Sequence, residues 1–113
     1  MKLSEIARFT NDVPAMTDFY RNLLGSEPVF SNNSIASFRC DDVTVLIHEN
    51  YTPGPNDLPS ENHIAFAVND LDSAFAQLQA QGVTIVAPPT EYPWGRSAYI
   101  RDSDGNLIEL AES

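Results

Sequence analysis

The sequence contains a single cysteine, Cys40, among 113 residues. One cysteine excludes an internal disulfide framework and a cysteine-rich zinc site. A metal site in this chain would therefore have to be built mainly from nitrogen and oxygen ligands.

Basic residues are also scarce, with six Lys and Arg against sixteen Asp and Glu, which gives a formal charge of −10. Nucleic-acid binding is disfavoured because neutralising phosphates requires the opposite balance of charge. Cationic ligands are not disfavoured. The acidic residues either form a solvated surface that keeps the protein in solution or steer such a ligand.

Long apolar runs and several well-known motifs are absent. No stretch approaches the roughly 20 apolar residues that span a bilayer, and no apolar segment at the N-terminus resembles a signal peptide, so we expect a soluble cytoplasmic protein with no membrane partner. The sequence also lacks a nucleophile elbow, a phosphate-binding glycine loop and a dinucleotide fingerprint. Nucleophilic hydrolysis and nucleotide chemistry are therefore disfavoured.

What the sequence does contain is a tandem repeat. The segment Glu5–Asp12 (EIARFTND) recurs 58 positions later as His63–Asp70 (HIAFAVND), with four of eight residues identical. Each copy leads into a segment with helical apolar spacing, Val13–Leu24 in the first and Leu71–Gln81 in the second. Asp12 and Asp70 stand where a helix N-cap is wanted, and Gly25 and Gly82 follow the helices.

Strand signals follow each helix, separated by Asn, Asp and Gly turns. Each half therefore reads β-α-β-β-β, and the fold class is α+β with two tandem βαβββ modules. The predicted strands after the helices are Glu27–Ser31, Ser34–Cys40, Val43–His48, Val83–Ala87, Ser97–Arg101 and Leu107–Glu112.

The chain is one domain by size, made of residues 1–50, a linker at 51–61 and residues 62–113. The linker contains Pro53, Pro55 and Pro59 and lacks any sustained period. Modules of about 55 residues would be marginal alone, so we expect the two to pack together.

Three residues of metal-ligand type occupy related positions. His63 begins its strand with Ala65 and Ala67 on the same face, and Glu5 holds the equivalent place in the first copy. Glu109 lies between apolar residues on the last strand, where a carboxylate is costly unless paired or metal-bound. Exposed glutamates and an ordinary strand histidine remain the alternative reading.

Two residues compete for the position of a fourth ligand. His48 closes the corresponding strand of the first copy, but Leu46 has the same parity and competes for the matching position. A shell of one imidazole and two carboxylates suits zinc, nickel, manganese or iron without identifying the ion.

Aromatic residues gather in the proline-rich loops. Tyr51, Tyr92 and Trp94, together with Arg96, lie in or beside the loops at residues 49–62 and 88–95. Such loops often contact a ligand, although loop aromatics also cover core edges, and both readings stay open.

The whole chain resembles the vicinal oxygen chelate superfamily of glyoxalases, bleomycin-resistance proteins and extradiol dioxygenases. The motifs that carry the resemblance are Asp18–Gly25 (DFYRNLLG), His63–Val68 (HIAFAV), Pro93–Arg96 (PWGR) and Arg101–Leu110 (RDSDGNLIEL).

The resemblance implies two βαβββ modules that form a curved mixed sheet and a cleft, often completed in a homodimer. It places metal ligands at Glu5, His63 and Glu109, with the remaining position nearest Leu46, which cannot bind a metal. The implied function is a metal-dependent enzyme, a lyase, isomerase or dioxygenase acting on a small molecule with vicinal oxygens, in which Glu5 also serves as the proton-transfer base.

A competing function also follows from the resemblance. The Asp41–Ile47 and Pro93–Arg96 segments, the short length and the acidic charge are similar to bleomycin-resistance proteins. Such proteins sequester a cationic or aromatic small molecule without metal and without chemistry.

Overall fold

The computed structural model describes all 113 residues as two helices and eight strands. It divides into two compact units: an N-terminal unit, Glu5–Asn62, and a C-terminal unit, His63–Ser113 together with Met1–Ser4. Strand β1 (Lys2–Thr10) runs through this boundary and so contributes to both units. Neither helix has the length and apolar character needed to cross a membrane.

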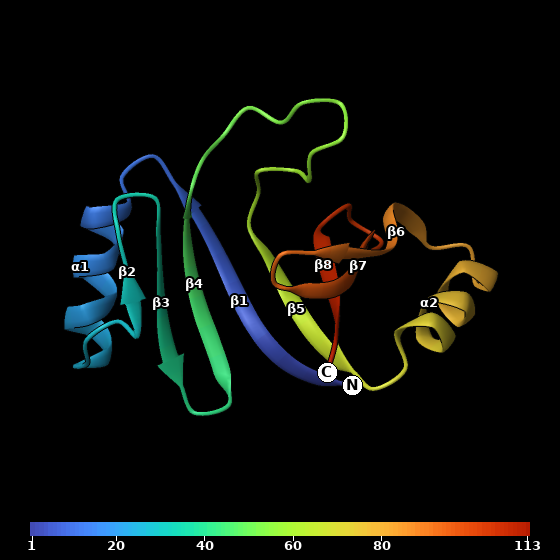
Figure 1. Ribbon diagram of the computed structural model, residues 1–113, viewed down its shortest axis with the longest axis horizontal. Coiled ribbons are helices and arrows are strands. Elements are labelled where there is room, and N and C mark those ends of the chain that lie inside the picture. Colours follow the sequence, from blue (N-terminus) through green and yellow to red (C-terminus); the bar gives the residue numbers. More distant parts are fainter. The chain divides into compact units, whose positions relative to one another are not determined.

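In the N-terminal unit the strands lie in the order β2-β3-β4-β1. β1 pairs with β4 in parallel, whereas β2–β3 and β3–β4 are antiparallel. In Figure 1 helix α1 lies beside these strands. The elements after β1 are α1 (Val13–Leu24), β2 (Phe30–Ser31), β3 (Ile35–Cys40) and β4 (Val43–Glu49).

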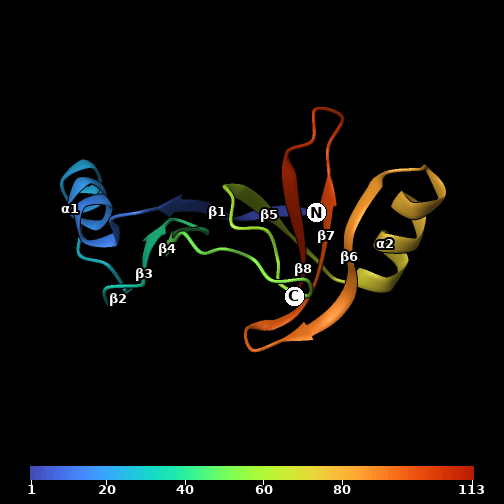
Figure 2. The same cartoon turned by 90° about the horizontal axis from the view of Figure 1, so that it is seen from above.

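The C-terminal unit repeats this arrangement in the order β6-β7-β8-β5. β5 pairs with β8 in parallel, and β6–β7 and β7–β8 are antiparallel. Figure 2 shows helix α2 running beside β6. The elements are β5 (His63–Val68), α2 (Leu71–Ala80), β6 (Thr84–Tyr92), β7 (Gly95–Arg101) and β8 (Leu107–Glu112). The predicted α+β fold of two βαβββ modules is therefore confirmed.

Both helices begin at the aspartates that the repeat indicated. An Asp12 carboxylate oxygen accepts a hydrogen bond from the Ala15 N–H at 3.0 Å, and Asp70 accepts one from the Ser73 N–H at 3.1 Å. Each bond satisfies a backbone donor that the first helical turn leaves without a partner. Gly25 ends α1 with φ of +66°, a left-handed conformation that glycine adopts without strain.

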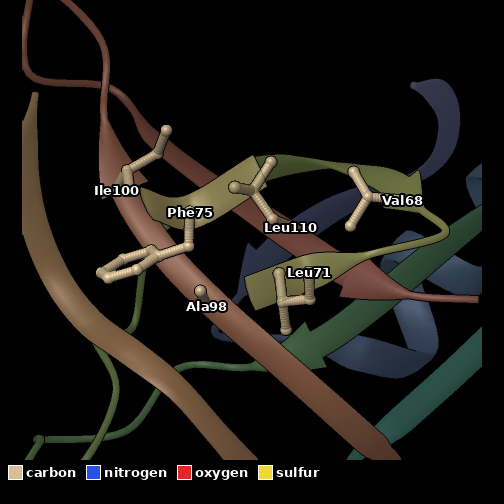
Figure 3. Close-up of a cluster of buried hydrophobic side chains, with 6 residues drawn as sticks. All are labelled: Val68, Leu71, Phe75, Ala98, Ile100 and Leu110. Atoms are coloured by element: carbon tan, nitrogen blue, oxygen red, sulfur yellow. The ribbon is translucent and has the colours of Figure 1, made fainter. Parts of the chain in front are cut away.

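Each unit has its own apolar core between its helix and one face of its strands. In the C-terminal unit, alternate residues of β5, β7 and β8 point toward α2 (Figure 3). This core contains Val68, Leu71, Phe75, Ala98, Ile100 and Leu110. In the N-terminal unit the core contains Val13, Ala36, Phe38, Val45 and Ile47. Because strand residues alternate between faces, the residues between these positions lie on the opposite face of each sheet.

Three strands differ from the sequence prediction by two residues or more. β2 is only Phe30–Ser31, shorter than the predicted 27–31, and β7 begins at Gly95, two residues before the predicted start. β6 extends to Tyr92 and includes the prolines at 88 and 89, where the sequence predicts a loop. β6 is the last strand in the sheet order, and its pairing with β7 shifts register between Ile85 and Thr90. Proline is tolerated there because an edge strand with a bulge has no need of every backbone donor.

Candidate functional site

The candidate site lies on the face of the C-terminal sheet that points away from α2. Glu109 on β8 pairs with Ala65 on β5 and with Tyr99 on β7. Their neighbours Phe66, Ile108, Ala98 and Ile100 belong to the apolar core around α2, so Glu109, Ala65 and Tyr99 face the other way. Because side chains alternate along β8, the Glu109 carboxylate lies on the face opposite the apolar core around α2.

Glu109 is buried, with 6% of its surface exposed, and both carboxylate oxygens have a neighbour. Ser97 Oγ donates a hydrogen bond to Oε2 at 2.8 Å, and Oε1 lies 3.5 Å from Nε2 of His63. A buried carboxylate is costly unless polar groups compensate for lost hydration. The structure thus brings two of the predicted metal ligands, His63 and Glu109, together in one unit.

A small side chain on β5 leaves room for the His63 imidazole to approach the Glu109 carboxylate. His63 pairs with Leu107, two residues before the Ala65–Glu109 pair along both strands, so the imidazole and the carboxylate approach each other diagonally across β5 and β8. The methyl group of Ala65, 2% exposed, leaves the space beside Glu109 that a larger side chain would fill. One of the two alanines noted in the sequence, Ala65, therefore lies directly opposite the carboxylate.

A row of aromatic rings extends from His63 to the tip of the β6–β7 hairpin. Tyr99 lies edge-on to His63 with ring centroids 6.1 Å apart, and Tyr92 lies edge-on to Tyr99 at 5.9 Å. Tyr92 in turn stacks on Trp94 at 4.7 Å with an interplanar angle of 1°. Since Trp94 is 59% exposed, the outer end of this row presents an aromatic surface to solvent.

Arg96 has a different position from the other loop residues. Its guanidinium donates to Asp72 at the start of α2 at 2.6 Å and to Glu112 on β8 at 3.3 Å. The hydrogen bond and charge of Asp72 raise the pKa of Arg96 above its ordinary value. Arg96 and Ser97 are adjacent on β7, so their side chains lie on opposite faces of the sheet. Arg96 points toward α2, and its two bonds link the helix to the sheet.

Tyr51 stabilises the segment that joins β4 to β5 in the sequence. Its hydroxyl donates to the Leu58 carbonyl oxygen at 2.6 Å, and its backbone N–H donates to Ser60 Oγ at 3.0 Å. Burial, followed by the charge of Asp57, raises the pKa of Tyr51. These contacts give Tyr51 a structural role in the segment predicted as a linker, where it holds residues 51–60 in a closed loop.

His48 is not close to Glu5 along the strands. It pairs with Phe9 on β1, whereas Glu5 pairs with Thr44, four residues earlier on β4. Four residues of strand correspond to about 13 Å. The His48 ring packs with Phe9 at 5.1 Å and Tyr51 at 5.8 Å, and Nδ1 lies 2.7 Å from the Glu49 carbonyl oxygen. His48 therefore lies in an aromatic cluster with Phe9 and Tyr51.

Glu5 lies on β1 directly after Ser4, the last of the N-terminal residues that belong to the C-terminal unit. Ser4 Oγ donates to the Ala65 carbonyl oxygen at 3.2 Å, which ties this part of β1 to β5 beside the pair of Ala65 and Glu109. Leu46, at the position matching Glu109 in the repeat, pairs with Ala7 on β1 and has no metal-binding atom.

Two residues at the site, Ser97 and Tyr99, were missed in the sequence. The sequence could have identified them, because the turn at residues 102–106 fixes the register in which the strands on either side of it pair. Counting outward from the Arg101–Leu107 pair places Tyr99 opposite Glu109 and Ser97 one step further along the same face. The hairpin register, used in this way, finds both residues.

A family model matches residues 2–110 of the chain and is described as the Glyoxalase/Bleomycin resistance protein/Dioxygenase superfamily. Among curated proteins, biphenyl-2,3-diol 1,2-dioxygenase 3 of Rhodococcus globerulus is 30% identical over 118 residues. The alignment covers 96% of this chain and 62% of the dioxygenase, so the chain spans less than two thirds of that relative's length.

Solved structures show the same fold. A methylmalonyl-CoA epimerase variant from Streptomyces coelicolor, bound to 2-nitronate-propionyl-CoA, has a TM-score of 0.72 at 22% identity, covering 100% of this chain and 94% of the epimerase. The Mn(II)-bound glyoxalase from Novosphingobium aromaticivorans has a TM-score of 0.72 at 23% identity, covering 98% of this chain and 38% of that chain.

The extent of the family match decides the classification. It includes the positions of His63 and Glu109 and all of both βαβββ modules except the last two residues of β8. The predicted resemblance is confirmed: the chain belongs to the glyoxalase/bleomycin resistance protein/dioxygenase superfamily.

Proposed function

We propose that this chain is a metal-dependent enzyme of glyoxalase or dioxygenase type that acts on a small molecule with vicinal oxygens. Glu5, His63 and Glu109 are the proposed ligands of a divalent ion, which is zinc, nickel, manganese or iron. The observation that carries the proposal is the buried carboxylate of Glu109 beside Nε2 of His63 on the face away from the core.

The separation of these two groups fits a shared ion. Zinc binds histidine nitrogen and carboxylate oxygen at about 2.0–2.2 Å, so two such ligands at a tetrahedral angle lie about 3.4 Å apart. The Nε2 of His63 and Oε1 of Glu109 are 3.5 Å apart, longer than most N–H···O hydrogen bonds. Glu5 is the proposed third ligand because it holds, at the start of the first copy of the repeat, the place that His63 holds in the second.

A divalent ion in such a site acts as a Lewis acid on substrate oxygens. The chain's own contribution is to hold the three ligands and to move a proton. We assign the proton transfer to Glu5, because a carboxylate next to the reacting centre can accept a proton once its ligation loosens. The aromatic row that ends at Trp94 supplies apolar contact area for a planar substrate.

Metal content tests this function. Protein purified without an affinity tag should contain close to one divalent ion per chain by elemental analysis, and His63→Ala should lose it. His48→Ala is the matched control, since the second histidine of the chain lies in the aromatic cluster with Phe9 and Tyr51. If no ion binds even after incubation with zinc, nickel, manganese and iron, the enzyme proposal is wrong.

A second candidate function is metal-free sequestration of a cationic or aromatic small molecule. The stacking of the half-buried Tyr92 on the exposed Trp94 favours it, together with the formal charge of −10. Titration with bleomycin should then change the fluorescence of Trp94, the single tryptophan of the chain, in a saturable way. A flat titration would exclude bleomycin as the ligand and count against this candidate.

A further inference from the structure

We infer that Ser97 determines how Glu109 binds the ion: its hydroxyl holds one carboxylate oxygen, so that Glu109 offers only the other. The site would thereby select transition-metal ions of low coordination number over Ca(II). This inference rests on the proposed function, and it makes Ser97 a positioning residue that acts through Glu109 without touching the ion.

The geometry of the carboxylate carries the inference. Ser97 is 1% exposed and its Oγ donates to Oε2 of Glu109 at 2.8 Å, while Oε1 lies toward Nε2 of His63 at 3.5 Å. Ser97 pairs with Ala111 and Glu109 pairs with Tyr99, so the hydroxyl reaches the carboxylate diagonally from the neighbouring strand. The two oxygens of Glu109 therefore point to different partners.

Rotation of the carboxylate is opposed by the surroundings. Turning both oxygens toward one ion would take Oε2 away from Ser97 and leave a buried hydroxyl without its acceptor. Leaving a buried donor without a partner costs about 1–3 kcal/mol. Tyr99, 3% exposed and directly opposite Glu109 on β7, further limits the room for such a turn. One-oxygen binding by Glu109 is therefore the arrangement that keeps every buried group satisfied.

This arrangement separates classes of metal ion. Ca(II) takes six to eight oxygen ligands and commonly binds a carboxylate through both oxygens. Zinc is satisfied by about four ligands, each contributing one atom. Outer groups that orient a metal ligand typically change metal affinity by about 10- to 100-fold when they are removed. A single serine hydroxyl is thus sufficient to shift the preference between the two classes.

The test compares Ser97→Ala with Thr17→Val, using Zn(II), Co(II) and Ca(II) as probes. Thr17 is the matched control because it is also a buried hydroxyl, 5% exposed, but it donates to the Val13 carbonyl oxygen inside α1. Affinities are measured by calorimetry, folding by circular dichroism, and the coordination number by the visible absorption of bound Co(II), which weakens as ligands are added.

In Ser97→Ala we expect Zn(II) affinity to fall about 10-fold or more while Ca(II) affinity is unchanged or rises. The Co(II) absorption should weaken as Glu109 begins to bind through both oxygens. Thr17→Val should match the wild type in both respects. A merely structural role for Ser97 would lower stability without changing the ratio of zinc to calcium affinity or the Co(II) spectrum.

The outcomes are distinguishable. If the wild type binds zinc and Ser97→Ala binds it with the same affinity, selectivity and spectrum, the inference is overturned and the proposed function stands. If the wild type binds neither these probes nor nickel, manganese or iron, the proposed function itself fails, whereas a wild type that binds Ca(II) in preference to Zn(II) overturns only the inference. If Ser97→Ala does not fold, X-ray absorption of the zinc-loaded wild type decides, because a carboxylate bound through both oxygens would contradict the inference.

Discussion

At the scale of single residues, Glu109 occupies a position that stability alone does not explain. A leucine of similar volume would suit a strand residue that is 6% exposed better than a carboxylate does. Ser97 and His63 compensate for its burial, but building such a set of partners gains little over an apolar side chain. Function is the simpler reason for a buried carboxylate here.

Glu109→Gln tests this separation of stability from function. Glutamine keeps an oxygen that accepts from Ser97 but removes the charge and most of the affinity for a divalent ion. We expect the free energy of unfolding of the metal-free protein to change by about 1 kcal/mol or less, in either direction. Metal binding should be lost. Urea unfolding in the presence of a chelator and elemental analysis measure the two effects, and a large loss of metal-free stability would show that the carboxylate is structural.

Asp102 makes the stability of the β7–β8 turn depend on pH. Its carboxylate accepts hydrogen bonds from the Asn106 side chain at 3.0 Å, the Asn106 N–H at 2.8 Å and the Asp104 N–H at 3.0 Å. The bonds from Asn106, chiefly, hold the pKa of Asp102 below its ordinary value. A carboxyl whose pKa is lower in the folded state adds stability above its unfolded pKa and loses it as the pH falls through the folded value.

We therefore expect Asp102→Ala to be less stable than the wild type at pH 7, with the difference shrinking below about pH 4. The measurement is urea unfolding of both proteins across this range, with NMR titration of the Asp102 carboxyl carbon. Asp104→Ala is the control, because Asp104 bonds to Asp102 through its backbone N–H, which the substitution keeps. A stability difference that stays constant between pH 7 and pH 2 would contradict this account.

At the scale of elements, most helices and strands could be predicted because their signals are local. The spacing of apolar residues, the caps at Asp12 and Asp70 and the turn at 102–106 each depend on a few neighbouring residues. The continuation of β6 through its two prolines could not be predicted in this way, since proline is acceptable only because β6 is an edge strand with shifted register.

The candidate site shows the same division. His63 and Glu109 stood out by residue type and by position in the repeat, whereas Ser97 acquires its role only through the pairing of β7 with β8. Arg96 stood out for its neighbours in the sequence, yet its partners Asp72 and Glu112 are 24 and 16 residues away. Residue type thus indicated the proposed ligands, and strand pairing decides which nearby side chains contact them.

The β6–β7 hairpin depends on one glycine. Gly95 has φ of +131°, a conformation that L-residues rarely adopt, and it pairs with Tyr92 directly across the turn. An added Cβ would meet nothing within 4 Å, so the cost of a substitution comes from the backbone alone.

We expect Gly95→Ala to lower the free energy of unfolding by about 1–3 kcal/mol and to loosen the stacking of Tyr92 on Trp94. Thermal unfolding and the fluorescence of Trp94 report the two effects. Gly54→Ala serves as the control, because Gly54 lacks a positive φ and its added Cβ would approach only the flexible side chain of Asp57, at 3.1 Å. Equal losses in the two variants would mean that backbone strain at Gly95 is not the cause.

At the scale of the whole molecule, the two units have separate apolar cores but one shared strand. Each unit has only about half of the 113 residues, and domains of that size bury too little surface to be more than marginally stable. Residues 2–4 of β1 belong to one unit and residues 5–10 to the other. Unfolding either unit therefore removes the support for one end of the same strand, and we expect the chain to unfold cooperatively.

Paired core truncations test this cooperativity. Ile47, 0% exposed, belongs to the N-terminal core, and Leu110, 1% exposed, belongs to the C-terminal core. Ile47→Ala and Leu110→Ala should each lower the free energy of unfolding by about 2–5 kcal/mol. Each should move one and the same transition, whether it is followed by Trp94 fluorescence, which reports on the C-terminal unit, or by far-ultraviolet circular dichroism, which reports on both. Two transitions, each sensitive to only one of the substitutions, would show instead that the units fold independently and that sharing β1 does not couple them.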